Sequence, residues 1–324
     1  MAHLYAALDP DAVMDCVESV GLRPDARILT LNSYENRVFQ IGIEDEDPIV
    51  GKFYRDARWT DAQILEEHDF TEELKSLELS VVAPLRINGK TLHKSGPFRF
   101  TLYPRQAGRT PNLEDENALS VLGRAIGRIH AAGQRPFGHR PELASQSHGH
   151  DARSAVLECG YLPAELGASY ESVTEQMLRD IDAVFESTPY RRIRLHGDCH
   201  MGNVLWREEV PHFVDFDDAR NGPAVQDLWM MLSGERSDQE IQLRAIIRGY
   251  LEFCDFDFSE LRLIEALRAL RMLYHSAWIA RRWDDPAFPQ AFPWWGSERY
   301  WSEHVLELRE QWAMIHEPPI AAYL

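Results

Sequence analysis

Cysteine is scarce in this chain of 324 residues, which contains only four. They are scattered as Cys16, Cys159, Cys199 and Cys254, without the short spacings typical of zinc ligands. So few and so dispersed cysteines exclude a small secreted scaffold held together by disulfides. We therefore expect a reduced, cytoplasmic protein.

Long apolar runs and basic residues are also in short supply. No apolar stretch approaches the roughly 20 residues of a membrane-spanning helix, and the opening MAHLYAALDP has no basic region or apolar core of a secretory signal. The chain has 34 Lys and Arg against 52 Asp and Glu, a formal net charge of −18. This charge argues against partners such as nucleic acids or anionic membranes, whose phosphates require clustered cations. It leaves ATP compatible, because a nucleotide site needs only a few local cations and Mg²⁺.

Polar residues concentrate in one stretch, residues 193–206, which reads IRLHGDCHMGNVLW. Its apolar ends are predicted to be two short strands of a hairpin, and the loop between them contains Asp198 and Asn203. A further apolar strand over residues 212–216 ends in carboxylates, the first of which is Asp215. We expect the three polar side chains to lie near one another at a strand edge.

These three side chains suit the transfer of a phosphoryl group from ATP to a hydroxyl. The reaction requires a carboxylate that accepts the hydroxyl proton or orients the hydroxyl, together with oxygen ligands for Mg²⁺. We predict that Asp198 is the catalytic carboxylate and that Asn203 and Asp215 are the metal ligands. A polar turn rich in Asp and Asn is the alternative, but the spacing of three potential ligands disfavours it.

The motif HGDCHMGN, followed by DFD at the end of the next strand, resembles the aminoglycoside phosphotransferase and choline kinase branch of the protein-kinase-like fold. Nearly the whole chain is similar to the stress response kinase A family of bacterial kinases. The segments that carry this resemblance are NSYENRV, VGKFYR, RWTDAQILEEH, RLHGDCHMGN, VDFDDARNGPAVQDLWM, and DPAFP with FPW. The resemblance implies accessory roles for His200 and Asp217, and a bracing role for Asp227 behind the catalytic loop. The segment between Asp215 and Asp227 is too short for the activation loop of a protein kinase.

The resemblance also implies nucleotide-binding residues in the first third of the chain. A predicted strand over residues 48–55 carries Lys52, which corresponds to the lysine that holds the α- and β-phosphates in kinase-like folds. The helix expected after Thr60 turns Glu67 toward its buried face, and a buried carboxylate needs a cation. We therefore predict a Lys52–Glu67 ion pair, with Glu66 as the fallback partner and two separate surface charges as the alternative.

The turn NSYEN corresponds to the glycine-rich turn of protein kinases, yet residues 32–41 contain no glycine. Ser33 and Asn36 can still donate hydrogen bonds to phosphate, and an ordinary hairpin turn is the alternative. By resemblance alone, the adenine base is expected to hydrogen-bond the backbone near Leu102 and Tyr103.

The second part of the chain is predicted to be mostly helical. Residues 138–170 show little periodicity, and we expect a solvated loop there rather than a metal site, despite His139, His148 and His150. The aromatic-rich segment over residues 283–301 is broken by three prolines, and packing is favoured over a platform for a cationic substrate. Helical periodicity and helix-end signals predict helices over residues 114–132, 171–186, 224–233, 239–253, 259–280 and 298–316.

These observations predict an α+β, two-lobed protein-kinase-like fold, with a small antiparallel-sheet N-lobe over residues 1–104 and a mostly helical C-lobe over residues 105–324. The predicted function is Mg²⁺- and ATP-dependent phosphoryl transfer to a hydroxyl, with Ser or Thr of proteins as the acceptor by resemblance. A kinase for a small molecule such as an aminoglycoside, choline or homoserine stays open, and a closed acidic pocket would favour it. A non-catalytic nucleotide-binding scaffold is the second alternative. The oligomeric state is not decided by the sequence, and a monomer is the working expectation.

Overall fold

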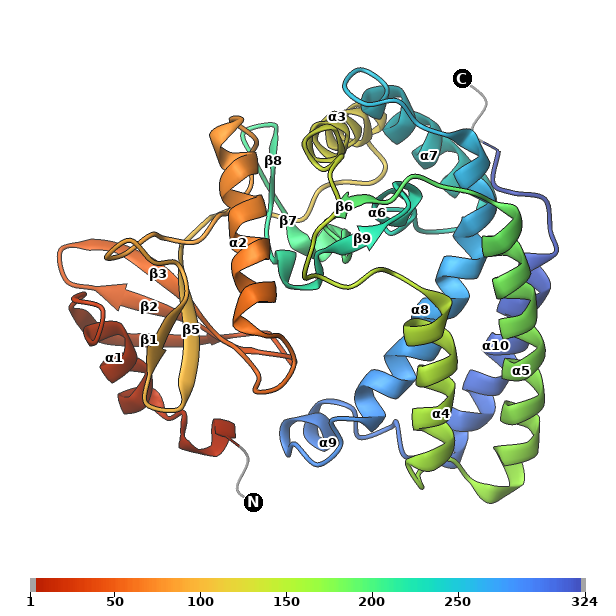
Figure 1. Cartoon of the computed structure of the whole chain (residues 1–324), viewed down its shortest axis with the longest axis horizontal. Helices are drawn as coiled ribbons and strands as arrows, with labels where there is room; N and C mark the ends of the chain where they lie inside the picture. Colours follow the sequence, from red (N-terminus) through yellow and green to blue (C-terminus); the bar gives the residue numbers. More distant parts are fainter. Residues whose placement is uncertain (1–3, 322–324) are drawn as a thin grey trace.

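The computed structural model describes residues 4–321, so the ends of the two predicted lobes, residues 1–3 and 322–324, lie outside it. A small lobe built on a sheet stands beside a larger, mostly helical lobe, and α2 lies between them (Figure 1). The predicted two-lobed α+β class is thereby confirmed. Within the described range, no helix combines the length and apolar character that a bilayer crossing requires.

The strands form one larger sheet and two small ones. They are β1 (Pro24–Leu31), β2 (Arg37–Ile43), β3 (Glu46–Phe53), β4 (His93–Ser95), β5 (Phe98–Pro104), β6 (Ile193–Leu195), β7 (Val204–Arg207), β8 (Val210–Phe213) and β9 (Arg220–Gly222). The α-helices are α1 (Pro10–Glu18), α2 (Asp61–Ser76), α3 (Glu116–Ala132), α4 (Asp151–Glu158), α5 (Ala164–Ser187), α6 (Val225–Trp229), α7 (Arg236–Tyr250), α8 (Ile264–Ala280), α9 (Ala287–Ala291) and α10 (Glu298–Ile315).

The N-lobe is an antiparallel sheet in the order β1-β2-β3-β5-β4, covered by α1. The α1 helix starts after Asp9, whose side chain accepts a hydrogen bond from the Ala12 amide at 2.8 Å. Val13 and Val17 of α1 are fully buried in the same apolar cluster as Phe53 of β3. The sheet therefore has its own core, separate from that of the helical lobe.

The α2 helix packs against the core of the helical lobe. It begins with a capping box in which Thr60 and Gln63 satisfy each other's backbone amides. Its buried face turns Glu67 inward, as expected, while Phe70 and Leu74 pack into the core of the helical lobe. A helix fixed in this way can carry a side chain into the space between the lobes.

In the helical lobe, α3 and α7 cross at very short range because glycines lie at the contact. A Cβ atom on Gly123 would lie 1.9 Å from the Ile246 carbonyl oxygen, and one on Gly249 would lie 2.0 Å from a carbonyl of α3. The crossing brings Tyr250 of α7 against His130 of α3, with 3.0 Å between the phenol oxygen and Nδ1. This pair lies beneath the candidate functional site.

The expectation of a solvated loop over residues 138–170 was wrong. The chain there forms a π-helical turn (Gln146–His150), α4 and the first turns of α5. A Cβ on Gly149 would meet side chains of α5 and α8, and Val156 of α4 is fully buried. Tertiary packing thus forms helices that local periodicity does not signal.

The predicted strands at residues 193–206 form, but they do not pair with each other. β6 pairs with β9, and β7 pairs with β8, each antiparallel. The loop from His196 to Asn203 therefore leads from one small sheet to another instead of closing a hairpin.

Most of the aromatic-rich segment packs into the helical lobe, which is the alternative that we favoured over a platform for a cationic substrate. Phe288, Trp295 and Trp301 are fully buried, and a short helix, α9, forms around Pro289. Trp294 remains 43% exposed.

Candidate functional site

The loop that follows β6 is held in place by one buried carboxylate, Asp227. Its two oxygens accept hydrogen bonds from the backbone amides of His196 and Gly197, at 2.8 and 2.9 Å. His130 Nε2 lies 3.0 Å from the same side chain. Gly197 has φ +84°, and a Cβ there would lie 2.2 Å from the Asp218 carbonyl oxygen, so no other residue fits without movement. Asp227 thus makes the contacts of the bracing residue that was predicted.

Asp198, the predicted catalytic carboxylate, is surrounded by hydrogen-bond donors. Arg271 Nη1 lies 2.8 Å from Oδ1, and His200 Nε2 lies 3.4 Å from Oδ2. Gly202 N–H donates to His200 Nδ1 at 2.9 Å, so a neutral His200 carries its proton on Nε2, facing Asp198. Burial alone would raise the pKa of Asp198, but the His200 hydrogen bond and the Arg271 charge outweigh it and lower the pKa to about 2. The carboxylate is therefore ionised at neutral pH.

Asn203 connects Asp198 to the strand that precedes Asp215. The Asn203 side-chain amide donates to the Asp198 backbone oxygen at 2.9 Å, and the Asn203 backbone oxygen accepts from the Val214 amide at 3.0 Å. This geometry leaves the amide oxygen of Asn203 for another partner. Asp215 follows directly, with its backbone in the left-handed region at φ 60°. A strained conformation at this position fits a residue whose orientation matters for function.

The oxygens of Asn203 and Asp215 form a chemically suitable, incomplete shell for Mg²⁺. Mg²⁺ favours one or two protein ligands and completes its octahedron with phosphates and water. The Asp215 side chain is 47% exposed, so it can reach a ligand. Across residues 4–321, no cluster of three His, Cys, Asp or Glu side chains could hold a metal by itself. A metal at this site would therefore depend on the phosphates of a nucleotide.

Lys52 lies opposite, on β3, but its partner differs from the expected one. Its ammonium is 2.5 Å from Asp215 Oδ1 and 4.0 Å from Asp217 Oδ1, and these two charges raise its pKa despite burial. Glu67 is 1% exposed. Among the residues that the structure describes, its Oε2 has no hydrogen-bond partner, and His68 Nε2 lies 3.7 Å from it. The predicted Lys52–Glu67 ion pair is absent from the contacts of the described chain, because Asp215 is closer to the lysine. Burial raises the pKa of the Glu67 carboxyl to about 7.

Glu66, the fallback partner for Lys52, has a different role. Its carboxylate accepts hydrogen bonds from three successive backbone amides, those of Gly138, His139 and Arg140, at 2.5 to 2.8 Å. These contacts attach α2 to the helical lobe. They orient the helix that carries Glu67, and they exclude Glu66 from the nucleotide side of the fold.

The turn predicted to hold phosphate is attached to the opposite lobe. Asn36 is buried, and its amide donates to Asp217 Oδ2 at 3.1 Å while its oxygen accepts from the Arg55 amide at 3.2 Å. Asn36 is therefore occupied by protein partners, contrary to the expectation that it is available to phosphate. Ser33 lies half-buried on the same turn.

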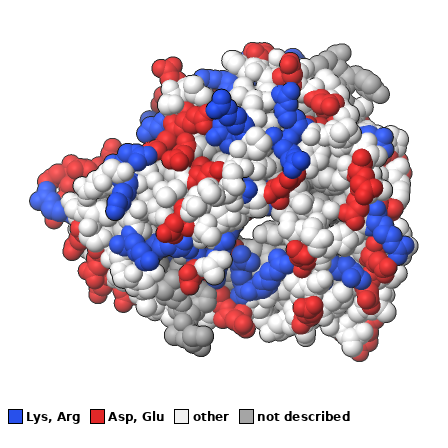
Figure 2. All heavy atoms as spheres, in the orientation of Figure 1, with Lys and Arg blue, Asp and Glu red and all other residues white. Residues whose placement is uncertain are grey.

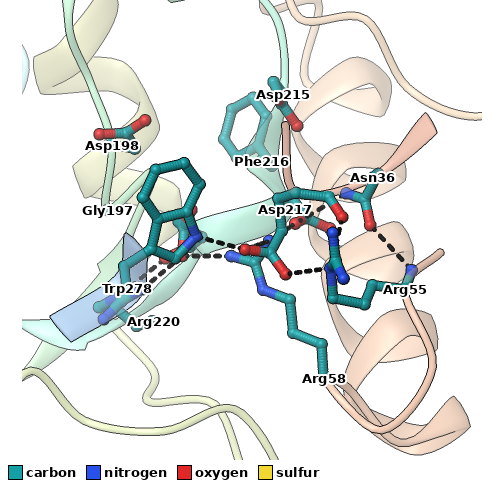
Figure 3. A network of polar contacts seen from close by, with 12 residues as sticks. Asn36, Arg55, Arg58, Gly197, Asp198, Asp215, Phe216, Asp217, Arg220 and Trp278 are labelled. Atoms are coloured by element: carbon teal, nitrogen blue, oxygen red, sulfur yellow. Dashed lines mark hydrogen bonds and ion pairs between the residues drawn. The ribbon is translucent and has the colours of Figure 1, made fainter. Parts of the chain in front are cut away.

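Charged residues from both lobes surround this turn, and we call them the interlobe arginine network. It consists of Glu35, Arg37, Arg55, Arg58, Asp217, Asp218, Arg220, Arg282 and Asp285. Glu35 at the tip of the turn lies 2.7 Å from Arg282 of the helical lobe and accepts from Trp278 Nε1 at 2.5 Å. Figure 3 shows Arg58 extended toward Asp217, with Asp215 above the pair and Asp198 farther to the left. No sequence pattern marks this network, because its paired members are up to 248 residues apart.

The backbone expected to bind adenine is only partly available. The Leu102 carbonyl accepts from the Leu85 amide at 2.7 Å, so an adenine contact must come from residues that follow it. Tyr103 pairs with Val50 across the sheet, and its ring lies 5.6 Å from the Lys52 ammonium. The Tyr103 hydroxyl is buried without a hydrogen-bond partner in the described structure.

Arg271 is the residue that the sequence analysis missed at the centre of the site. It lies on α8, 73 positions after Asp198, and no local motif marks it. The only available signal was its place within a predicted amphipathic helix, which does not reveal the element that the helix faces.

Comparisons with known proteins agree with this geometry. The model of the phosphotransferase enzyme family matches residues 27–264. Stress response kinase A of Escherichia coli (strain K12) is 43% identical over 98% of this chain and 97% of its own length. The serine/threonine protein kinase RdoA of Salmonella typhimurium (strain LT2) is 42% identical over 98% of this chain and 97% of its own.

Among solved structures, the amicoumacin kinase hAmiN in complex with AMP-PNP, Ca²⁺ and Ami has a TM-score of 0.75 at 18% identity, covering 97% of this chain and 96% of that one. A microcompartment-associated aminopropanol kinase has a TM-score of 0.73 at 16% identity, covering 95% and 96%. These likenesses concern the fold, whereas the two curated relatives are similar in sequence from end to end. The chain therefore belongs to the stress response kinase A family, within the phosphotransferase enzyme family.

Proposed function

We propose that this phosphotransferase uses ATP and Mg²⁺ to phosphorylate a Ser or Thr hydroxyl of a protein. The observation that supports it best is a continuous set of contacts from Asp198 through Asn203 to the strand end at Asp215, and from Asp215 to Lys52. A proton acceptor, two oxygen ligands and a phosphate-binding cation are thereby joined in one small region.

In the proposed reaction, the acceptor hydroxyl oxygen attacks the γ-phosphorus and forms a new P–O bond. The bond from that phosphorus to the β–γ bridging oxygen breaks, and ADP leaves with the electron pair. The hydroxyl proton passes to Asp198. A carboxylate with a pKa near 2 is a weak base, so its main contribution is to orient the hydroxyl.

Lys52 and the metal ligands act on the donor. The Lys52 ammonium would exchange Asp215 for the α- and β-phosphates, which frees the Asp215 carboxylate to bind a metal. Asn203 and Asp215 would hold Mg²⁺, which when bound would supply positive charge to offset the charge that develops on the phosphates. Glu67 remains the predicted partner of Lys52 in the nucleotide-bound state.

The choice of a protein acceptor rests on similarity. The Salmonella relative that is named a serine/threonine protein kinase matches nearly the whole chain at 42% identity. The amicoumacin and aminopropanol kinases match only at 18% and 16%. A kinase for a small molecule is therefore the second candidate, favoured by the fold of those two structures.

Three further expectations accompany the proposed function. The lobes divide after residue 104, at the end of β5. The protein acts in the cytoplasm, where ATP is available. It acts as a monomer.

Incubation with γ-labelled ATP and Mg²⁺ tests the proposal. The acceptor arms are a mixture of proteins, a panel of amino alcohols and aminoglycosides, and water alone, each repeated with EDTA and with the Asp198→Asn variant. We expect label on Ser or Thr of protein, lost with EDTA and with the variant. Label only on a small molecule would select the second candidate. Nucleotide binding without transfer to any acceptor would favour a non-catalytic scaffold.

A further inference from the structure

The carboxylates around the acceptor side of the site are already paired with arginine. Glu35 lies 2.7 Å from Arg282, Asp217 lies 2.7 Å from Arg58, and Asp218 lies 2.6 Å from Arg220. Asp285 is 2.7 Å from Arg55, and Asp198 is 2.8 Å from Arg271. A protonated amine that arrives beside Asp198 would therefore meet carboxylates whose charge is neutralised, although the chain as a whole is strongly acidic.

One face of α8 supplies positive charge to this region. Arg271 and Trp278 of α8, and Arg282 in the turn just after its end, follow the i, i+7, i+11 spacing of a single helical face. Arg271 contacts Asp198, whereas Trp278 and Arg282 contact Glu35, so this face spans from the catalytic loop to the turn of the N-lobe. In the view of Figure 2, Lys and Arg side chains border the lower side of the hollow between the lobes.

Arg271 differs from the other arginines because it is both attached to Asp198 and accessible. Its side chain is 48% exposed, compared with 7 to 14% for Arg58, Arg220 and Arg282. A guanidinium carries five N–H donors, and Asp198 takes a single contact from Nη1. The remaining donors are suited to bind a second, planar anion such as a carboxylate.

We propose that Arg271 is a specificity-determining residue that binds an acidic side chain next to the acceptor hydroxyl, so that the substrate is a Ser or Thr flanked by Asp or Glu. This inference rests on the proposed function and adds the substrate class. The same guanidinium also positions Asp198. The net charge of −18 by itself would favour a cationic acceptor. That charge acts at long range, whereas the groups beside Asp198 are arginines.

The test uses ratios of kcat/KM between peptides. These ratios separate the recognition of an acidic neighbour by Arg271 from the positioning of Asp198 by the same residue. Three peptides carry one Ser each and differ only in its two neighbours, which are Glu, Gln or Lys. The kcat/KM of each peptide is measured for the wild-type chain, Arg271→Met, Arg271→Lys and Arg281→Gln. The last variant is the matched control, because Arg281 is an exposed arginine near the end of the same helix that contacts only the Asp151 carbonyl. A small hydroxy acid and a matched amino alcohol complete the panel.

We expect the wild type to prefer the Glu peptide over the Gln peptide by roughly tenfold and over the Lys peptide by more. Arg271→Met should bring the Glu-to-Gln ratio close to one, Arg271→Lys should retain part of the preference, and the control should keep all of it. A disturbance of Asp198 lowers kcat/KM for all three peptides equally, so it leaves the ratio unchanged. Circular dichroism checks that the variants are folded.

The inference is overturned if the wild type prefers the Lys peptide, if Arg271→Met keeps the wild-type ratio, or if the hydroxy acid is a better acceptor than every peptide. These results leave the proposed kinase activity intact. Absence of transfer to any acceptor, by contrast, removes the proposed function and this inference with it.

Discussion

The helical lobe and the sheet lobe each form one wall of the candidate site, and the two walls are held in place by different interactions. On the helical lobe, the catalytic loop is fixed by short hydrogen bonds from its own backbone to Asp227, behind which His130 and Tyr250 are buried. On the sheet lobe, the turn that contains Glu35 is held by ion pairs that reach across to the other lobe, from Glu35 to Arg282 and from Arg37 to Asp285. The first wall is internally complete, whereas the second depends on a partner surface.

This difference has physical consequences. Hydrogen bonds between a buried carboxylate and backbone amides respond little to salt. Ion pairs near a surface weaken as ionic strength rises, and a buried pair that loses one member leaves a costly unpaired charge. The site therefore combines a wall fixed by its own hydrogen bonds with a wall fixed by ion pairs to the other lobe. Four predictions would break or sharpen this comparison, and they follow in order of decreasing expected effect.

The largest effect is expected on the wall formed by the helical lobe, from Asp198→Asn. The amide has nearly the same shape, but it replaces one acceptor oxygen by an N–H₂ donor, so it can neither orient the hydroxyl in the same way nor accept its proton. We therefore expect kcat to fall about 10²- to 10⁴-fold. Affinity for Mg-ATP should change little, because Asn203 and Asp215 remain. Steady-state kinetics and calorimetric titration measure both. A variant with near-normal turnover would remove Asp198 from the catalytic role.

Asp215→Ala is expected to weaken Mg-ATP binding roughly 100-fold and to abolish turnover, because the metal would lose its carboxylate ligand. The control is the wild type in EDTA, which should bind ATP about as weakly as the variant does with Mg²⁺. Titration calorimetry of the two samples decides the matter. Equal affinities of variant and wild type in Mg²⁺ would show that Asp215 is not a ligand.

On the wall formed by the sheet lobe, Glu35→Gln should lower the free energy of unfolding by about 3–5 kcal/mol, since Arg282 and its neighbours would lose a partially buried partner. Glu44→Gln is the matched control at the other end of β2, where the ion pair is exposed and should contribute at most about 1 kcal/mol. Chemical unfolding in low and high salt compares the two. A loss equally small for both would mean that the network does not stabilise the fold.

Glu67→Gln is expected to have the smallest effect. It should raise the free energy of unfolding, whereas Glu35→Gln should lower it. The Glu67 carboxyl has a pKa of about 7 in the folded state and 4.5 in the unfolded chain. Between pH 4.5 and 7 the folded state therefore retains a proton that the unfolded state releases. Stability therefore falls as pH rises from 4.5 to 7. Glu67→Gln should raise the free energy of unfolding at pH 8 by at most about 3 kcal/mol, and by nothing at pH 4.

The same variant should lower ATP turnover if Glu67 pairs with Lys52 once nucleotide is bound. A gain in stability together with unchanged kinetics would leave Glu67 as a purely structural residue. Destabilisation at pH 8 would contradict the assigned pKa shift.

The sequence predicted one wall far better than the other, for a physical reason. Asp198, Asn203 and Asp215 lie within 18 consecutive residues, and strand ends and turns bring them together by local geometry. Even there the pairing of β6 was wrong, because its partner β9 comes from beyond the metal-binding segment. The sequence could not predict the contacts of three arginines, Arg58, Arg271 and Arg282. An arginine on a helix or loop has the same sequence pattern whether it faces solvent or a carboxylate of another lobe.

The Lys52–Glu67 pair shows a different limit. The burial of Glu67 was correctly predicted from helical periodicity, but burial does not decide which of several carboxylates a lysine contacts. Asp215 lies at 2.5 Å and takes that place. The helices over residues 146–158 were missed because long-range packing at Gly149 and Val156, and not an amphipathic pattern, stabilises them.

The attachment of the N-lobe turn to α8 and to Asp285 also bears on rates. If ADP release requires the lobes to separate, Glu35 must part from Arg282 and Arg37 from Asp285 before the nucleotide leaves. The opening of this contact, and not the transfer step, would then set the maximal turnover number, as in many enzymes whose lids open slowly. Because these pairs are largely buried, added salt should change the rate of ADP release only slightly, whereas Glu35→Gln should accelerate it.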